Sequence, residues 1–208
     1  MMIENVNVFP FMHRARYEMD FSLVKDKIDS VLDECREKVV EHNIPILEDG
    51  GAMSTAPASF KFVPHLLPEF EGLNNFLQQT IDQVLPMWGI SDRVMKYIDR
   101  SWCNVHPPGG VTLEHRHTGI LVAAVYYLNK PKDSGNLLVR NPMEMYKCND
   151  PIESDYWDTF NWQSIEAETG DLLLFPGWLL HKTEENKSSE DRYVITWNIC
   201  FDKPKYPQ

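Results

Sequence analysis

The chain has 208 residues, a length that suits one domain with a substantial hydrophobic core. Its formal net charge of −11 at pH 7 would repel a phosphate backbone, so we expect no nucleic-acid partner. No run approaches the roughly 20 apolar residues that cross a bilayer, and residues 1–20 lack the apolar centre of a signal peptide. The four scattered cysteines fit neither a zinc knuckle nor a disulfide framework. The sequence therefore predicts a soluble, cytoplasmic protein.

The first half of the chain shows helical patterning. Between Asp20 and Asn43 apolar residues recur every three or four positions, which predicts a helix with Asp20 or Ser22 as its cap. A second set of the same spacing begins after Pro68 and stops near Pro86 and Gly89. The intervening stretch EDGGAMSTAPASF, residues 48–60, is rich in small and turn-forming residues, and we interpret it as a mobile loop.

From about residue 93 onward the pattern changes to short runs of β-branched, aromatic and apolar residues separated by turn residues. The candidate strands are SWCNVH, VTLEHRH, ILVAAVYYLN, NLLVRN, DLLLF, WLLHKT and RYVITWNICF. This series predicts an α+β, mainly β fold, either a jelly roll or a sandwich. One long insertion, residues 143–162, is a candidate functional loop near a site.

Three histidines are candidate metal ligands. His115 and His117 lie two apart in LEHRHTG, so on a strand their side chains would share a face, although such a pair can arise by chance. His181 is the single polar residue that ends GDLLLFPGWLLH. Non-haem Fe(II) enzymes hold iron with three facial ligands, but zinc also accepts three imidazoles plus water. If a metal is bound, we expect the three rings to converge to within about 3 to 4 Å.

Arg192 begins the apolar strand RYVITWNI. A guanidinium buried in such a strand would be costly unless an anion faces it, and a carboxylate matches its planar fork. An exposed arginine at the start of the strand is the alternative interpretation.

The run from His115 through YYLN, GDLLLFPGWLLH and the arginine strand resembles the Fe(II)/2-oxoglutarate-dependent oxygenases, particularly those of phages and marine bacteria, and also the prolyl hydroxylases. The opening VNVFP and the helix after it are similar to the start of those phage and bacterial oxygenases, so the resemblance covers nearly the whole chain. It implies a double-stranded β-helix, or jelly roll, in a single domain over residues 1–208. Residues 1–92 would then be mainly helical support, and residues 93–203 the jelly-roll core.

By this resemblance the three histidines are the catalytic, iron-binding residues. Four further residues would bind cosubstrate. Arg192 and Tyr127, the second tyrosine of YYLN, would hold the distal carboxylate of 2-oxoglutarate, while Asn104 and Thr196 would add polar contacts to cosubstrate or water.

Position 117 departs from the pattern of the family, which usually has aspartate or glutamate there. A neutral imidazole in place of a carboxylate raises the charge of the metal site by about one unit. Glu114 is the nearest substitute carboxylate, but on a regular strand it would face away from His115, and only a bulge would turn it inward.

The activity implied is oxidative decarboxylation of 2-oxoglutarate with O2, coupled to hydroxylation of a second substrate. A peptidyl proline is one candidate for that substrate, and small metabolites are equally open. Two alternatives remain. One is a cupin-like dioxygenase that uses three histidines without 2-oxoglutarate, and the other is a non-catalytic β-sandwich binding module. The sequence predicts no oligomeric state, and a phage-encoded enzyme would work in the host cytoplasm.

Overall fold

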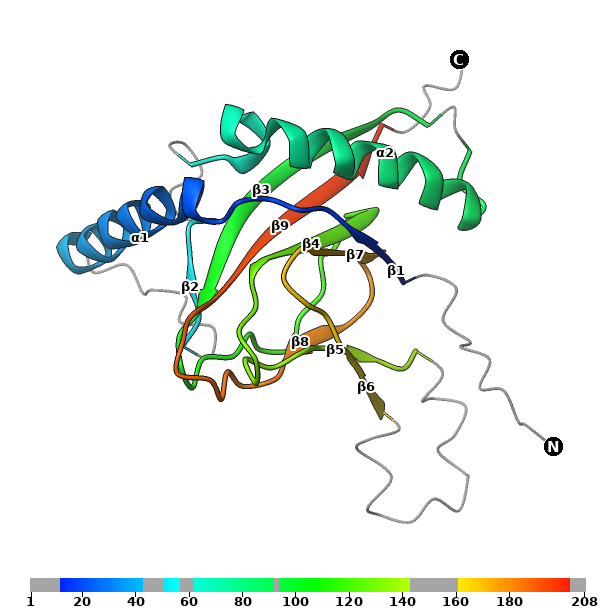
Figure 1. Cartoon of the computed structure of the whole chain (residues 1–208). Helices are drawn as coiled ribbons and strands as arrows, with labels where there is room; N and C mark the ends of the chain where they lie inside the picture. Colours follow the sequence, from blue (N-terminus) through cyan, green and yellow to red (C-terminus); the bar gives the residue numbers. More distant parts are fainter. Residues whose placement is uncertain (1–11, 43–50, 57–61, 92–93, 143–160, 203–208) are drawn as a thin grey trace, which may run out of the picture.

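A computed structural model describes residues 12–42, 51–56, 62–91, 94–142 and 161–202 (Figure 1). In chain order the elements are β1 (His13–Arg16), α1 (Ser22–His42), β2 (Met53–Ser54), the short 3-10 helices η2 (Pro64–Leu66) and η3 (Pro68–Phe70), α2 (Glu71–Met87), β3 (Lys96–His106), β4 (Val122–Asn129), β5 (Leu137–Arg140), β6 (Trp162–Ile165), β7 (Asp171–Pro176), β8 (His181–Thr183) and β9 (Arg192–Phe201). Within the described residues, no helix has both the length and the apolar character needed to cross a membrane.

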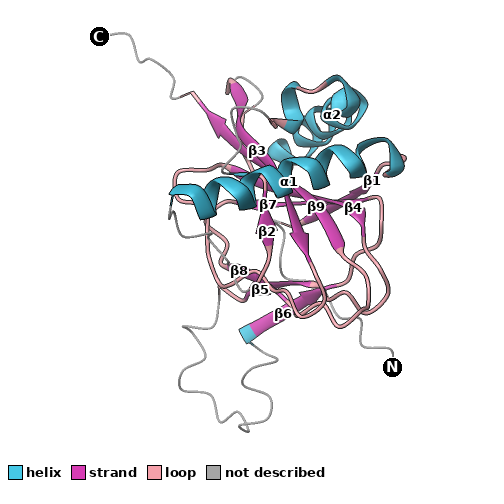
Figure 2. Cartoon of the chain, turned by 90° about the vertical axis from the view of Figure 1, so that its left-hand side faces the viewer, coloured by secondary structure: helices cyan, strands magenta, loops and turns pink. Residues whose placement is uncertain are grey.

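The strands form two antiparallel sheets. The larger has the order β1-β7-β4-β9-β3-β2, and the smaller has the order β6-β5-β8. Helices α1 and α2 lie on the face of the larger sheet that points away from the smaller one (Figures 1 and 2). The predicted mainly β architecture, a double-stranded β-helix supported by helices, is therefore confirmed.

Strand β9 shows how the sequence builds the two layers of the core. Because successive side chains of a strand point to opposite faces, Ile195 and Trp197 pack against the helices, while Val194 packs between the two sheets. The indole Nε1 of Trp197 donates to Oδ1 of Asn74 on α2 at 3.2 Å. Fully burying one such apolar side chain contributes about 1.5–3 kcal/mol, so this alternation fixes which face of β9 turns toward the smaller sheet.

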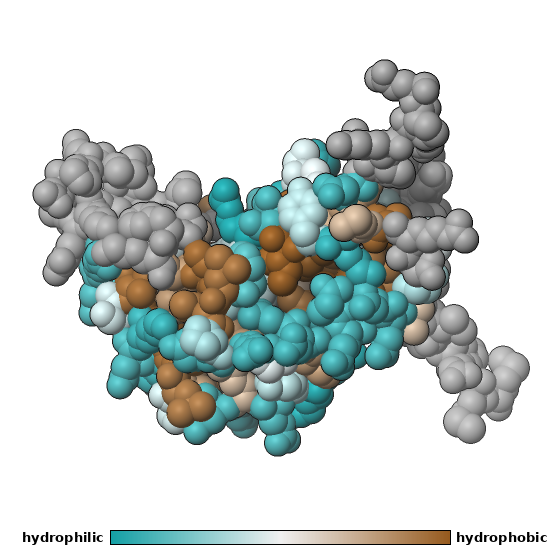
Figure 3. Space-filling view, turned by 90° about the horizontal axis from the view of Figure 1, so that it is seen from above, coloured by the Kyte–Doolittle hydropathy of each residue, from teal (hydrophilic) through white to brown (hydrophobic). Residues whose placement is uncertain are grey.

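We call the face of the larger sheet that turns toward the smaller sheet the inner face; Ala123, Tyr127 and Val194 lie on it. On the opposite side, the surface over α2 is mixed in character. Seen from above, apolar side chains form separate groups between hydrophilic ones (Figure 3). The described residues of this surface therefore present no single continuous apolar area.

Both predicted helices are confirmed. The Asp20 carboxylate accepts a hydrogen bond from the Ser22 N–H at 3.0 Å at the start of α1. Helix α2 runs one residue beyond Pro86, and Gly89 follows it with a φ of 74°, a conformation that favours glycine.

Two of the predicted strands are wrong in part. VTLEHRH is not a strand, and only Val111 and His115 make isolated bridges there. In WLLHKT the strand is limited to β8, because residues 177–179 turn after β7. The turn after Pro176 includes apolar residues that the sequence pattern assigned to the strand, so the strand starts later, at His181.

The first half of the chain contributes to the larger sheet as well. Strand β1 pairs with β7 at one edge, which the sequence reasoning missed. Residues 51–56 were expected in a mobile loop, but Met53 and Ser54 pair with β3 at the other edge. The rest of that loop, and residues 143–160 of the insertion, lie outside the described residues. The domain boundaries themselves stay a prediction.

Candidate functional site

The three histidines come from two segments that are joined by backbone hydrogen bonds. His181 begins β8, whereas His115 and His117 lie in the irregular segment between β3 and β4. The N–H of His115 donates to the carbonyl of His181 at 2.9 Å, and the N–H of His181 donates back at 3.0 Å. The N–H of His117 donates to the carbonyl of Gly177 at 2.8 Å. These contacts hold residues 66 apart in sequence side by side.

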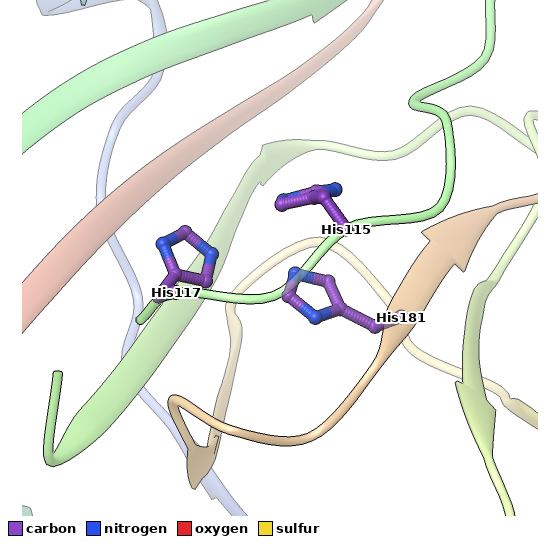
Figure 4. Close-up of side chains that lie close together, drawn as sticks. All are labelled: His115, His117 and His181. Carbon is purple, nitrogen blue, oxygen red and sulfur yellow. The ribbon is translucent and has the colours of Figure 1, made fainter. Parts of the chain in front are cut away.

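The three rings surround a common space (Figure 4). Their ligand nitrogens all lie within 4.8 Å of one another. Metal–nitrogen bonds of about 2.1 Å would place facial nitrogens about 3.0–3.4 Å apart. The expected convergence to 3 to 4 Å is therefore approached but not reached, and the rings must move together on binding an ion.

In two of the imidazoles, a contact with the backbone determines which ring nitrogen carries the proton. Nδ1 of His115 lies 2.8 Å from the carbonyl oxygen of Leu113, and Nδ1 of His181 lies 2.8 Å from that of Leu179. A carbonyl only accepts, so each Nδ1 carries the proton and each Nε2 keeps its lone pair free. That is the tautomer of a metal-binding histidine.

Burial keeps the rings of His117 and His181 neutral. It lowers the pKa of His181 to about 3 and that of His117 to about 4, and the neighbouring His115 ring adds to both shifts. A neutral imidazole is the form that coordinates a metal, so neither ring has to lose a proton at pH 7 before binding.

Glu114 does not join the cluster. Its Oε1 pairs with Nη1 of Arg140 at 3.3 Å on the exposed side of the segment. Among the described His, Cys, Asp and Glu residues, only the three histidines form a group that could share an ion. The donor set is therefore uncharged, and a divalent ion bound there would keep both of its positive charges.

Arg192 is buried, with 1% of its surface exposed, so the alternative of an exposed arginine is wrong. Its Nη1 donates to the carbonyl oxygens of Ser134 and, at 3.0 Å, Gly135. Its Nη2 is buried and has no hydrogen-bond partner. An unpartnered guanidinium nitrogen in the interior is costly, and a carboxylate would satisfy it.

Gly135 makes this anchoring possible. Its φ is 83°, and a Cβ there would lie 2.7 Å from the carbonyl oxygen of Glu184 and 3.0 Å from Nη1 of Arg192. Only a residue without a side chain lets the turn approach the guanidinium so closely.

Three further predicted residues lie on the same inner face as Arg192. Val194 is directly opposite both Asn104 on β3 and Tyr127 on β4, and Thr196 lies two positions further along β9. Nδ2 of Asn104 donates to Oγ1 of Thr196 at 3.5 Å. Burial raises the pKa of Tyr127 to about 12, so its hydroxyl stays protonated and can donate. The structure thus gathers these residues inside the barrel.

His106 was missed in the sequence. It lies directly opposite Arg192, and its Nε2 lies 2.7 Å from Oγ1 of Thr112. Its Nδ1 is buried without a partner, and burial, with the charge of Arg192, lowers its pKa to about 3. The alternation along SWCNVH, which puts His106 on the face of Asn104, was the signal that could have found it.

A wide surface hollow lies outside the turn that holds Arg192. It is lined by basic and acidic side chains that largely pair with each other, as in the contact of Arg16 with Glu168 at 3.1 Å. The three histidines do not line it. We place the candidate functional site at the histidines and the inner face, where the unpartnered Nη2 of Arg192 and Nδ1 of His106 lie.

One known family matches the segment of the chain that carries these residues. Residues 100–198 match the family described as "Putative 2OG-Fe(II) oxygenase". This segment contains all three histidines and all four predicted cosubstrate residues. No curated protein matches the chain in sequence.

Several solved structures share the fold. A viral collagen prolyl hydroxylase from Paramecium bursaria Chlorella virus 1, in complex with 2-oxoglutarate, has 12% identity and a TM-score of 0.56, over 91% of this chain and 95% of its own. A Trichoplax adhaerens prolyl hydroxylase in complex with a hypoxia-inducible factor peptide has 17% identity and a TM-score of 0.53, over 92% and 84%. The α-ketoglutarate-dependent carbocyclase of nogalamycin biosynthesis has 18% identity and a TM-score of 0.54, over 92% and 79%.

Proposed function

Because this chain belongs, through residues 100–198, to the 2OG-Fe(II) oxygenases, which use Fe(II), 2-oxoglutarate and O2, we propose that it couples 2-oxoglutarate decarboxylation to hydroxylation of a second substrate. The observation that carries the proposal is the pairing of two features in one interior. The three-histidine cluster and a buried arginine with an unfilled Nη2 occupy the same side of the larger sheet.

The three histidines fit the metal. Ligand nitrogens within 4.8 Å of one another, and free Nε2 lone pairs on His115 and His181, are the donor chemistry that Fe(II) accepts. Three protein ligands would leave positions open for cosubstrate and O2. When bound, Fe(II) supplies the O2 activation that joins decarboxylation to oxidation of a C–H bond.

Arg192 and Tyr127 fit the far carboxylate of 2-oxoglutarate. The guanidinium is fixed by the two carbonyls that accept from Nη1, so Nη2 is held ready before the ligand arrives. Tyr127 is 2% exposed and keeps its proton, so its hydroxyl can donate to the same carboxylate. Preorganised donors bind more tightly because they lose little freedom on binding.

The apolar wall around these groups excludes water. Ala123, Val125 and Phe175 line the inner face, and the Phe175 ring lies 4.8 Å from the His181 ring. Small residues on β4 leave space for cosubstrate, while the ring packs the buried ligand in place. Low water content strengthens the electrostatic contacts of Arg192 and protects the reaction from side paths.

His117 gives the site its particular charge. A metal held by three neutral imidazoles keeps one more positive charge than a metal held by two imidazoles and a carboxylate. The extra charge favours the anionic chelating end of 2-oxoglutarate. We therefore propose that the site depends more on the cosubstrate for its charge balance than a site with a carboxylate ligand does.

Peptidyl proline is our leading candidate for the hydroxylated group. Two of the structures with the same fold are prolyl hydroxylases, and one of them holds a peptide. The carbocyclase has the same fold, so a small metabolite is the other candidate.

Two alternatives are less well supported. A cupin-like enzyme that ignores 2-oxoglutarate gives no reason for the unpartnered Nη2 of Arg192. A non-catalytic binding module would need all three histidines to have met by chance.

The test is turnover of 2-oxoglutarate. Protein reconstituted with Fe(II) and supplied with O2 should convert 2-oxoglutarate to succinate, and proline-containing peptides should increase the rate. The His115→Ala variant, which removes one ligand, should form no succinate. If the wild-type protein binds iron but neither binds nor converts 2-oxoglutarate, the cupin-like alternative replaces this proposal.

A further inference from the structure

Two polar residues, Arg100 and Asn198, are not used by the proposed metal and cosubstrate sites. They lie at the end of the inner face that is farther from Arg192, which we call the outer end. Along β9, Arg192 and Asn198 are six residues apart on the same face, which is about 20 Å at about 3.4 Å per residue. Between them Thr196 lies opposite Trp102, whose ring centroid is 6.1 Å from that of His117. The histidines thus lie between the Arg192 end, where the cosubstrate carboxylate fits, and the Asn198 end.

A β-bulge turns Arg100 toward this outer end. On β3, Ile98 pairs with Ile199 and Arg100 pairs with Asn198, so Asp99 is one extra residue. In a regular strand without the bulge, Arg100 would share a face with Ile98, which packs against the helices. With it, Arg100 stands opposite Asn198 on the inner face. Bulges beside active sites commonly redirect a side chain in this way.

Both side chains have unused binding capacity. Arg100 is exposed, and in the described parts of the chain no carboxylate lies within 4.0 Å of its guanidinium. Oδ1 of Asn198 is buried and accepts no hydrogen bond. An unsatisfied carboxamide oxygen needs an N–H donor, and a free guanidinium needs an anion. Half-buried Trp102 supplies an apolar surface beside them.

We propose that Arg100 and Asn198 form the substrate-recognition site of this oxygenase and select an amino acid or peptide through one carboxylate and one N–H. Arg100 binds the carboxylate, Asn198 accepts the N–H, and Trp102 packs against the carbon atoms presented to the metal. In a chain of net charge −11, a local cation is needed to attract an acid to this end of the inner face. This inference rests on the proposed function and names the substrate class for it.

The two sources of this chemistry are distinguished by matched probes. For free amino acids, the common L-amino acids are compared with their α-carboxamides. For peptides, short proline-containing peptides with glutamate next to the proline are compared with the same peptides carrying glutamine there. Binding is measured by calorimetry on protein loaded with Zn(II) and 2-oxoglutarate, which does not turn over, and succinate formation is measured on the Fe(II) form.

We expect one acid set to bind at least about tenfold more tightly than its amide set, because a charge-assisted guanidinium contact is lost in the amide. Arg100→Gln should remove the preference, and Arg100→Lys should restore part of it. Asn198→Asp, which puts a negative charge opposite Arg100, should reduce acid binding further. Lys132→Gln is the matched control, because it removes one exposed positive charge from the turn after β4, at the Arg192 end.

The outcomes separate the two proposals. If Zn(II) or 2-oxoglutarate fails to bind, the proposed function is wrong. If both bind, and acids and amides bind alike or neither set binds, the recognition site is wrong and the function stands. Equal loss in Arg100→Gln and Lys132→Gln would also overturn it, since the effect would then be one of overall charge.

Discussion

Replacing Arg192 with lysine tests how the cosubstrate is held. Lysine keeps the charge, but its single ammonium cannot bond to the carbonyls of Ser134 and Gly135 and at the same time reach the ligand. Losing one hydrogen bond to a charged group costs about 1.5–3 kcal/mol, which is a rise in the dissociation constant of about 10-fold to 150-fold. The affinity for the metal should not change, because the Arg192 guanidinium bonds to the carbonyls of Ser134 and Gly135 and not to any of the three candidate metal ligands.

The assay is anaerobic calorimetry of 2-oxoglutarate binding to the Fe(II)-loaded wild type and variant, with iron binding measured separately. Arg140→Lys is the control. Arg140 ends strand β5 of the smaller sheet, and its Nη1 pairs with the Glu114 carboxylate, so the variant makes the same substitution at an arginine that has a partner. Its variant should bind 2-oxoglutarate as the wild type does. An unchanged 2-oxoglutarate affinity in Arg192→Lys, with iron bound normally, would refute the assignment of Arg192.

Three further predictions concern the same interior. His181→Ala should abolish iron binding, while Glu114→Ala should leave it unchanged, as equilibrium dialysis can show. Gly135→Ala should weaken 2-oxoglutarate binding and lower the melting temperature, because its Cβ would crowd Nη1 of Arg192. His106 is neutral when folded, with a pKa of about 3 against 6.5 unfolded, so the unfolded state binds more protons as pH falls. Protonation of His106 in the unfolded state should therefore lower the free energy of unfolding at pH 5 by about 2 kcal/mol relative to pH 7.5. His106→Gln should remove this difference, as denaturant titrations at the two pH values can show.

The fold was predictable wherever one strong pattern covered a whole element. The period of α1 and α2 and the β-branched run of β9 each placed an element correctly. The short edge strands β1 and β2 were missed because edge pairing depends on a partner strand that local sequence does not reveal. The segment around His115 was predicted as a strand because it is a short run between turn residues, but it is held by two single bridges instead.

The site could be predicted in its parts but not in its arrangement. The histidine spacing and the arginine strand indicated the candidate residues, and the structure brings the three histidines together. The sequence could not show that Nη1 of Arg192 is already bonded while Nη2 is not. Nor could it reveal the bulge at Asp99, since an extra residue is visible only in the register of β3 with β9. Both facts depend on contacts between distant segments.

The central claim is that 2-oxoglutarate chelates iron held by His115, His117 and His181. Addition of 2-oxoglutarate to the anaerobic Fe(II) protein should produce the weak visible charge-transfer band of that chelate, and His181→Ala should show none. A wild-type protein that binds iron tightly at these histidines, yet gives no band at saturating 2-oxoglutarate, would contradict the account.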